Sequence, residues 1–157
     1  MSHQIKVLLV DEDNTFRQFA RAGLQNTHDI IVVGEGLAGQ DAVILASELR
    51  PDVILLGVDG LCVEHIDTMA QINRVAPQSK LIVLGRESVD KSLVLEAFRK
   101  GAWGYLHKKV AHAKAKPDEE PLAEIIKAIR TVSQGGAAIS PDVAGWILDA
   151  VYEISQR

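Results

Sequence analysis

The chain has 157 residues, which corresponds to one globular domain with at most a short extension. Hydrophobic residues make up 47% and charged residues 24%, an ordinary composition that excludes a disordered chain, a collagen-like repeat and a disulfide-rich scaffold. The net charge of −4, from 17 basic and 21 acidic residues, gives no basic footprint, so we expect this chain itself not to bind nucleic acid.

The cysteine content and the apolar runs indicate the cellular compartment of the protein. A single cysteine, Cys62, cannot form an internal disulfide, and the N-terminus does not resemble a signal peptide. The apolar runs are far shorter than the roughly 20 residues that a membrane-spanning helix needs. We therefore expect a cytoplasmic protein that does not contact a membrane.

Short apolar runs rich in β-branched residues predict strands covered on both faces, as in a parallel sheet. The predicted strands are residues 5–10, 30–33, 53–56, 81–84 and, more weakly, 104–107. Between them, apolar residues at helical spacing predict helices around residues 16–24, 42–49, 66–75 and 93–98, and a fifth from about 119 to 133. Regular alternation predicts an α/β fold with a doubly wound sheet, for which five strands suit the flavodoxin-like order 2-1-3-4-5.

Capping residues agree with these boundaries. Asp13 is placed to cap the first helix, and Gly101 to end the fourth. Pro51 and Pro77 follow the second and third helices and stop them before the next strand. The local signals and the periodicity therefore predict the same elements.

Two segments are additional to the five strands and five helices of such a fold. Residues 110–121, with two lysines, two prolines and an acidic triplet, predict an exposed loop insertion. Ser140 followed by proline predicts the start of an extra helix over 141–155, and we divide the chain into a domain over 1–136 and a C-terminal helix or linker over 137–157. This helix carries an apolar stripe that either packs on its own domain or forms a dimer contact: Val143, Ile147, Val151 and Ile154.

A glycine pattern after the second predicted strand matches G-x-G-x-x-G at Gly34, Gly36 and Gly39. In dinucleotide-binding folds this loop follows the first strand, and a sheet of this size lacks the second nucleotide-binding half. We therefore interpret the pattern as a βα loop and not as a cofactor site.

Acidic residues follow the first predicted strand directly, at Asp11, Glu12 and Asp13. Neighbouring carboxylates repel one another unless a hard cation such as Mg²⁺ binds them through oxygen, and Asp13 can instead cap the helix. Lys108 comes just after the fifth predicted strand. Because the ends of parallel strands converge at one edge of the sheet, Lys108 is expected to face the acidic pair.

The ordered motifs VLLVDE at 7–12, VVGE at 32–35, RPDVILL at 50–56 and KGAWGYLHK at 100–108 resemble the receiver domain of bacterial two-component response regulators. The resemblance covers about residues 5–134. The stretches that follow the last predicted strand are similar to the subfamily that carries a LuxR-type helix-turn-helix, and the sequence stops where that domain would begin. We therefore expect either a natural stand-alone receiver or a truncated piece of a longer regulator.

The resemblance implies roles for several residues. In this family an aspartate at the end of the third strand accepts a phosphoryl group as nucleophile. Asp11 and Glu12 match the acidic pair that holds Mg²⁺, and Asp59 matches the residue that lends a carbonyl to the metal. Lys108 matches the lysine that binds the phosphoryl oxygens, and Tyr105 matches the aromatic residue that turns inward on activation.

Two positions depart from the family pattern. The phosphoacceptor position is Gly57, and the position of the phosphate-binding hydroxyl is Gly85. Asp59 lies two residues, about 6–7 Å of extended chain, beyond the strand end, which is too far to replace the acceptor. We therefore expect an atypical receiver, or pseudo-receiver, that requires no cofactor and whose Mg²⁺ binding is weakened by the loss of a carboxylate.

The two glycines also predict a hollow bordered by Asp11, Glu12, Arg86 and Lys108. A buried ammonium without a partner is costly, so we expect Lys108 to pair with Asp11. The alternatives are that Arg86, ordered water or a small anion fills the hollow.

These observations favour a regulatory interaction module that is not an enzyme, because no catalytic triad, metal-binding His/Cys cluster or P-loop pattern occurs in the sequence. We expect contact with protein: a homodimer mate, a histidine kinase or another regulator. The alternatives are the regulatory half of a DNA-binding transcription factor and a sensor of small anions or metabolites. The expected interaction surface comprises Asp90, Lys91, Arg99, Lys100 and Tyr105.

Overall fold

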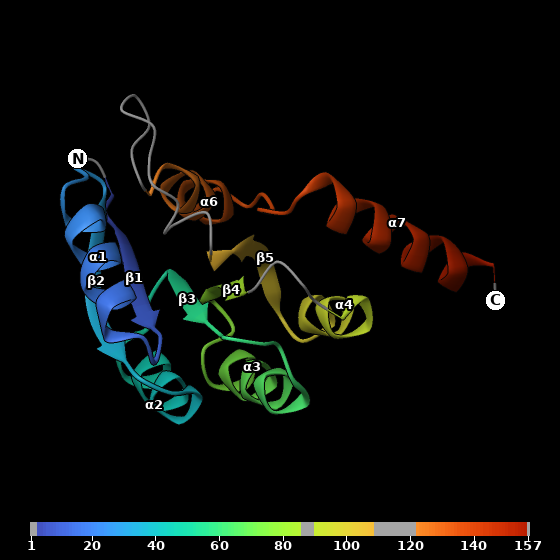
Figure 1. Cartoon of the computed structure of the whole chain (residues 1–157), viewed down its shortest axis with the longest axis horizontal. Helices are drawn as coiled ribbons and strands as arrows, with labels where there is room; N and C mark the ends of the chain where they lie inside the picture. Colours follow the sequence, from blue (N-terminus) through green and yellow to red (C-terminus); the bar gives the residue numbers. More distant parts are fainter. Residues whose placement is uncertain (1–2, 86–89, 109–121, 157) are drawn as a thin grey trace.

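The structure is a computed structural model that describes residues 3–85, 90–108 and 122–156. One parallel sheet of five strands has the order β2-β1-β3-β4-β5, as predicted (Figure 1). The strands are β1 (Ile5–Val10), β2 (Ile30–Gly36), β3 (Val53–Gly57), β4 (Lys80–Gly85) and β5 (Ala102–His107). The described helices are α1 (Asn14–Gln25), α2 (Gly39–Leu49), α3 (Val63–Val75), α4 (Lys91–Arg99), α6 (Ala123–Ser133) and α7 (Pro141–Ser155).

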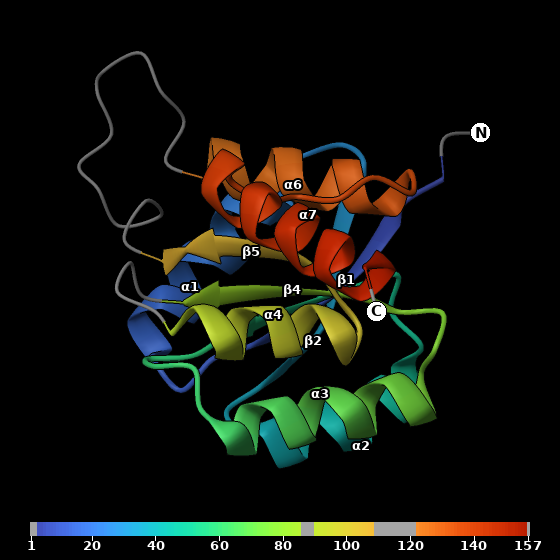
Figure 2. The same cartoon turned by 90° about the vertical axis from the view of Figure 1, so that its right-hand side faces the viewer.

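Helices cover both faces of the sheet, which explains the continuous apolar runs of the strands. Side chains of β1 alternate between the faces: Val7 and Leu9 pack with α1 and α6, and Leu8 and Val10 pack with α2, α3 and α4. Figure 2 shows α6 on one side of the sheet and α2, α3 and α4 on the other. The burial of both faces confirms the doubly wound, flavodoxin-like α/β fold.

The predicted helix ends are present in the structure. The Asp13 carboxylate accepts a hydrogen bond from the Phe16 amide at 3.1 Å and caps α1. Gly101, with φ of +114°, follows α4 in a backbone conformation that other residues rarely adopt. Ser140 Oγ accepts from the Val143 amide at 3.4 Å at the start of α7.

Four of the five strands are longer than predicted, and the second is extended most. The second strand continues to Gly36, with a register shift between Val7 and Leu8 of its partner β1. The last strand begins at Ala102 instead of 104. The G-x-G-x-x-G glycines serve packing here, since a Cβ at Gly34 would meet the Leu49 side chain at 2.6 Å.

The C-terminal segment returns to the sheet before it forms α7. Ala138 makes a parallel bridge with Gly104 of the edge strand β5, and α7 then packs on α4. The predicted stripe is divided between two environments. Val143 is buried and Ile147 packs against the core, whereas Val151 and Ile154 are 57% and 59% exposed.

Some predicted features lie outside the described residues. These are the loop insertion at 110–121, the first residues of the helix predicted from 119, and Arg86. Within the described part of the chain, no helix is long and apolar enough to cross a membrane.

Candidate functional site

The carboxyl ends of β1, β3 and β5 bring the predicted site residues together. Val10 pairs with Leu56 in neighbouring strands, so Asp11 and Gly57 follow side by side. Lys108 follows the last residue of β5 and reaches Asp11 across the sheet edge, 97 positions away in the sequence. The convergence expected for a parallel sheet therefore assembles the site.

Asp11 is held at the site by contacts with three other residues. Its side chain is 3% exposed, and the Nζ atom of Lys108 lies 3.0 Å from each of its two carboxylate oxygens. Only Oδ1 is in hydrogen-bonding geometry with the ammonium, and Oδ1 also accepts from the Asp13 amide at 2.9 Å. The Arg17 guanidinium donates to the backbone carbonyl of Asp11 at 2.5 Å. The predicted ion pair is present.

The space expected at Gly57 is filled by the neighbouring carboxylate. A Cβ atom built on Gly57 would overlap Oδ2 of Asp11. The sequence predicted a hollow there, and the part of it where a side chain at 57 would begin is occupied by the side chain of Asp11. Glycine at 57 is what permits the observed Asp11 position.

The space at Gly85 is filled in the same manner by Tyr105. A Cβ atom at Gly85 would overlap the Tyr105 hydroxyl oxygen. Tyr105 is 3% exposed, and burial raises the pKa of its phenol to about 12. Its ring makes an edge-to-face contact with His107, with centroids 5.9 Å apart. Tyr105 therefore points into the protein.

What remains of the crevice is a hollow of about 200 Å³ at the ends of β1 and β3. Asp11, Glu12, Gly57, Asp59 and His65 line it together with neighbouring backbone, and Lys108 and Gly85 do not. Glu12 and Asp59 are exposed. Among the described residues, no three His, Cys, Asp or Glu side chains are grouped as a metal site.

His65 was not predicted as a lining residue of this hollow. Its Nδ1 accepts from the Cys62 amide at 3.1 Å and lies 3.2 Å from the Cys62 sulfur. This contact caps the first turn of α3, a role usually filled by an acidic or amide side chain. No sequence signal distinguishes a histidine in this position from an ordinary surface histidine.

Only part of the predicted interaction surface is exposed to solvent. Lys91, Arg99 and Lys100 are exposed on or beside α4, and exposed Asp90 caps that helix by accepting from the Ser92 amide at 2.8 Å. Tyr105 was expected to belong to this surface, and its burial shows that this part of the prediction is wrong.

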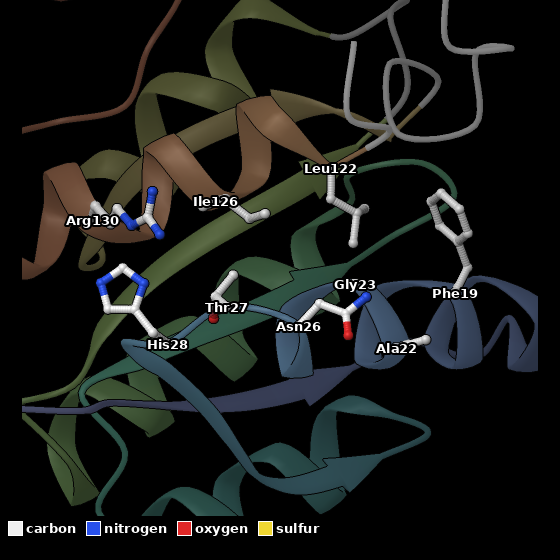
Figure 3. A pocket seen from close by; sticks show the side chains of 9 residues that line it. All are labelled: Phe19, Ala22, Gly23, Asn26, Thr27, His28, Leu122, Ile126 and Arg130. Atoms are coloured by element: carbon white, nitrogen blue, oxygen red, sulfur yellow. The ribbon is translucent and has the colours of Figure 1, made fainter. Parts of the chain in front are cut away.

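A larger hollow of about 550 Å³ lies between α1, the loop that follows it and α6 (Figure 3). Phe19 and Leu122 lie at one end and His28 and Arg130 at the other. Arg130 forms two hydrogen bonds with the Asp29 carboxylate, at 2.8 and 2.9 Å, which lower the pKa of that carboxyl. The sequence did not predict this hollow, because its walls come from segments about 100 residues apart.

Comparison with protein families gives a match over residues 7–116 to the response regulator receiver domain. Among curated proteins, the transcriptional regulatory protein LiaR of Bacillus subtilis is 37% identical over 92% of this chain. The chain is 33% identical to the response regulator protein VraR of Staphylococcus aureus over 88%, and 30% identical to the transcriptional regulatory protein DegU of Brevibacillus brevis over 90%. The chain spans 63%, 61% and 55% of these three relatives, respectively.

Solved structures share the fold. The response regulator domain of CheB from Thermotoga maritima superposes with a TM-score of 0.68 at 26% identity, over 84% of this chain and 98% of that one. A LuxR-family response regulator from Aurantimonas superposes with a TM-score of 0.73 at 24% identity, over 95% of this chain and 99% of that one, a likeness in fold alone.

Proposed function

The chain belongs to the response regulator receiver domain family, and from that membership we propose that it acts in signal transduction through protein contacts that do not depend on phosphorylation. It is the receiver part of a two-component response regulator. The proposal concerns how this receiver is regulated, because the family's activating step needs a carboxylate that position 57 does not supply.

The position of Asp11 is the observation that carries the proposal. Its Oδ2 atom lies where a side chain at position 57 would begin, and its carboxylate is paired with Lys108. The family's lysine is therefore engaged by a carboxylate that belongs to the protein itself. A phosphoryl group arriving at this edge would meet neither a nucleophile at 57 nor an unpaired ammonium at 108.

The same geometry fits Mg²⁺ poorly. Both Asp11 oxygens face the Lys108 ammonium, and the third carboxylate of the family site is absent at Gly57. The affinity of oxygen sites for hard cations rises with the number of charged ligands. Glu12 and the residues around Asp59 alone make a weak metal site. We therefore propose that the protein needs no metal for its activity and that it catalyses no reaction.

The state of Tyr105 supports action without phosphate. In the family this aromatic residue turns inward on activation, and here it is buried with its hydroxyl in the space left by Gly85. The protein therefore holds the inward arrangement with no phosphoryl group. We propose that its partners are proteins of the cytoplasmic signalling pathway: a second copy, a histidine kinase or another regulator.

One observation favours a second, compatible role. Two of the three relatives compared above are named transcriptional regulatory proteins, and this chain spans 63% and 55% of their lengths. The receiver would then be the regulatory half of a DNA-binding factor. A sensor role in the crevice is less favoured, since Asp11 and Tyr105 occupy the space that the two glycines would have opened.

Incubation with acetyl phosphate and MgCl₂, followed by intact mass measurement, tests the proposal. A receiver that retains the acceptor aspartate serves as positive control under the same conditions. We expect no phosphoryl adduct on this chain and no change in its near-ultraviolet circular dichroism with beryllofluoride. A phosphoaspartate mapped to any crevice residue, Asp59 included, would overturn the proposal.

A further inference from the structure

The buried Tyr105 is connected to the C-terminal helix through the edge of the sheet. The Tyr105 amide donates to the Ala138 carbonyl at 2.9 Å, and the Ala138 amide donates to the Trp103 carbonyl at 3.1 Å. The two bonds fix Ala138 against β5 on either side of Gly104. A Cβ at Gly104 would lie 3.0 Å from the Ala138 carbonyl oxygen, so glycine there permits this approach.

Helix α7 begins three residues after this contact, at Pro141. Val143 is 3% exposed and belongs to the same buried cluster as Tyr105. Trp146 and Ile147 pack against that cluster, and the Lys91 ammonium of α4 lies 5.9 Å from the centroid of the Trp146 ring. Figure 2 shows α7 crossing the β5 edge between α6 and α4. The first half of α7 therefore rests on a surface to which Tyr105 contributes.

Position 85 decides where Tyr105 can lie. Because a Cβ there would overlap the tyrosine hydroxyl, any residue larger than glycine must displace the ring or shift the end of β4. Tyr105 also belongs to the buried cluster that includes Val143 of α7. Displacement of the tyrosine thus disturbs the β5 backbone that holds Ala138 and the cluster that holds Val143.

We propose that Gly85, Tyr105 and α7 form one latch: glycine at 85 keeps Tyr105 buried, and buried Tyr105 keeps α7 docked on α4. The docked helix covers part of the α4 surface, so α7 is an intramolecular competitor for any protein that binds there. A side chain at position 85 releases the helix. The latch does not depend on whether any residue of the protein accepts phosphate.

Tyrosine titration gives a direct test, because the chain has only two tyrosines, Tyr105 and the exposed Tyr152. In a Tyr152→Phe background the tyrosinate absorbance reports Tyr105 alone. We expect Gly85→Thr to move its midpoint from about 12 toward the ordinary value near 10. Amide exchange in residues 141–155 should accelerate on the order of tenfold or more, with β1 and β3 still protected.

Gly60→Thr is the matched control, since a Cβ at Gly60 meets nothing within 4 Å, and it should change neither measurement. Coupling is reciprocal, so Trp146→Ala, which loosens α7 directly, should lower the Tyr105 midpoint as well. This second variant tests the latch even if Gly85→Thr fails to fold. An exposed Tyr105 with unchanged protection of α7, or a loosened α7 with an unchanged tyrosine midpoint, would overturn the proposal.

Discussion

The Lys108 ammonium lies 3.0 Å from both carboxylate oxygens of Asp11, and the two side chains are 12% and 3% exposed. This pair joins the end of β1 to the end of β5 across the edge where the family carries out phosphoryl transfer. The Asp13 amide adds a backbone hydrogen bond to Oδ1 of the same carboxylate. The site is thus organised around an internal ion pair.

Removal of the lysine should destabilise the protein strongly. Lys108→Met leaves the Asp11 carboxylate buried without its cation, which typically costs about 3–5 kcal/mol in the free energy of unfolding. The double variant Asp11→Asn/Lys108→Met should recover part of this loss, because no buried charge remains. Urea unfolding at pH 7 measures both, with Lys127→Met on the exposed side of α6 as control. Equal losses for the single and double variants would contradict the prediction that the unpaired Asp11 charge causes the loss.

A methyl group at position 57 should act through Asp11. Gly57→Ala places a Cβ against Oδ2 of Asp11, so the carboxylate must move away from Lys108, at a cost of about 1–3 kcal/mol. In an Asp11→Ala background the same substitution should cost less than about 0.5 kcal/mol, because the obstructing atom is gone. Denaturant unfolding of the four proteins of this cycle gives the coupling energy. Additive effects would mean that Asp11 does not occupy the position-57 space in solution.

The sequence was most informative where local patterns and topology act together. The apolar runs, the caps at Asp13 and Ser140 and the alternation of elements predicted the sheet order and the bounds of α7. Strand-end convergence was enough to predict the Lys108–Asp11 pair.

The filling of the crevice was not predictable, because the placement of a neighbouring side chain after a loss depends on packing in three dimensions. The sequence shows two missing side chains but not that Asp11 and Tyr105 take their space. The apolar stripe of α7 is similar. Its spacing predicts one face, but only Val143 and Ile147 pack on the domain, and Val151 and Ile154 remain exposed.

Burial of Tyr105 predicts a specific loss of stability at alkaline pH. The folded protein keeps the phenol protonated up to a pKa of about 12, whereas in the unfolded chain it ionises near 10. Between these values the unfolded state binds fewer protons, so the free energy of unfolding falls by up to about 1.4 kcal/mol per pH unit from this group. Tyr105→Phe lacks the effect, and the difference between the two stability curves over pH 10–12 measures it. Parallel curves would mean that Tyr105 is accessible in solution.

The ion pair between Asp29 and Arg130 predicts a loss of stability at acidic pH. Because the guanidinium lowers the pKa of Asp29 below 3.8 in the folded protein, its stabilisation is complete above that value and disappears as pH falls through the folded pKa. Arg130 is 41% exposed, so solvent and salt screen the pair and we expect a contribution of only about 1 kcal/mol. Asp29→Asn should therefore be less stable than the wild type at pH 7, and the difference should shrink as pH falls through the folded pKa of Asp29. The exposed Asp67→Asn serves as control. The difference in stability between wild type and Asp29→Asn could also persist unchanged to pH 2. That result would show that Asp29 stabilises the fold through the hydrogen bonds of its side chain and not through its negative charge.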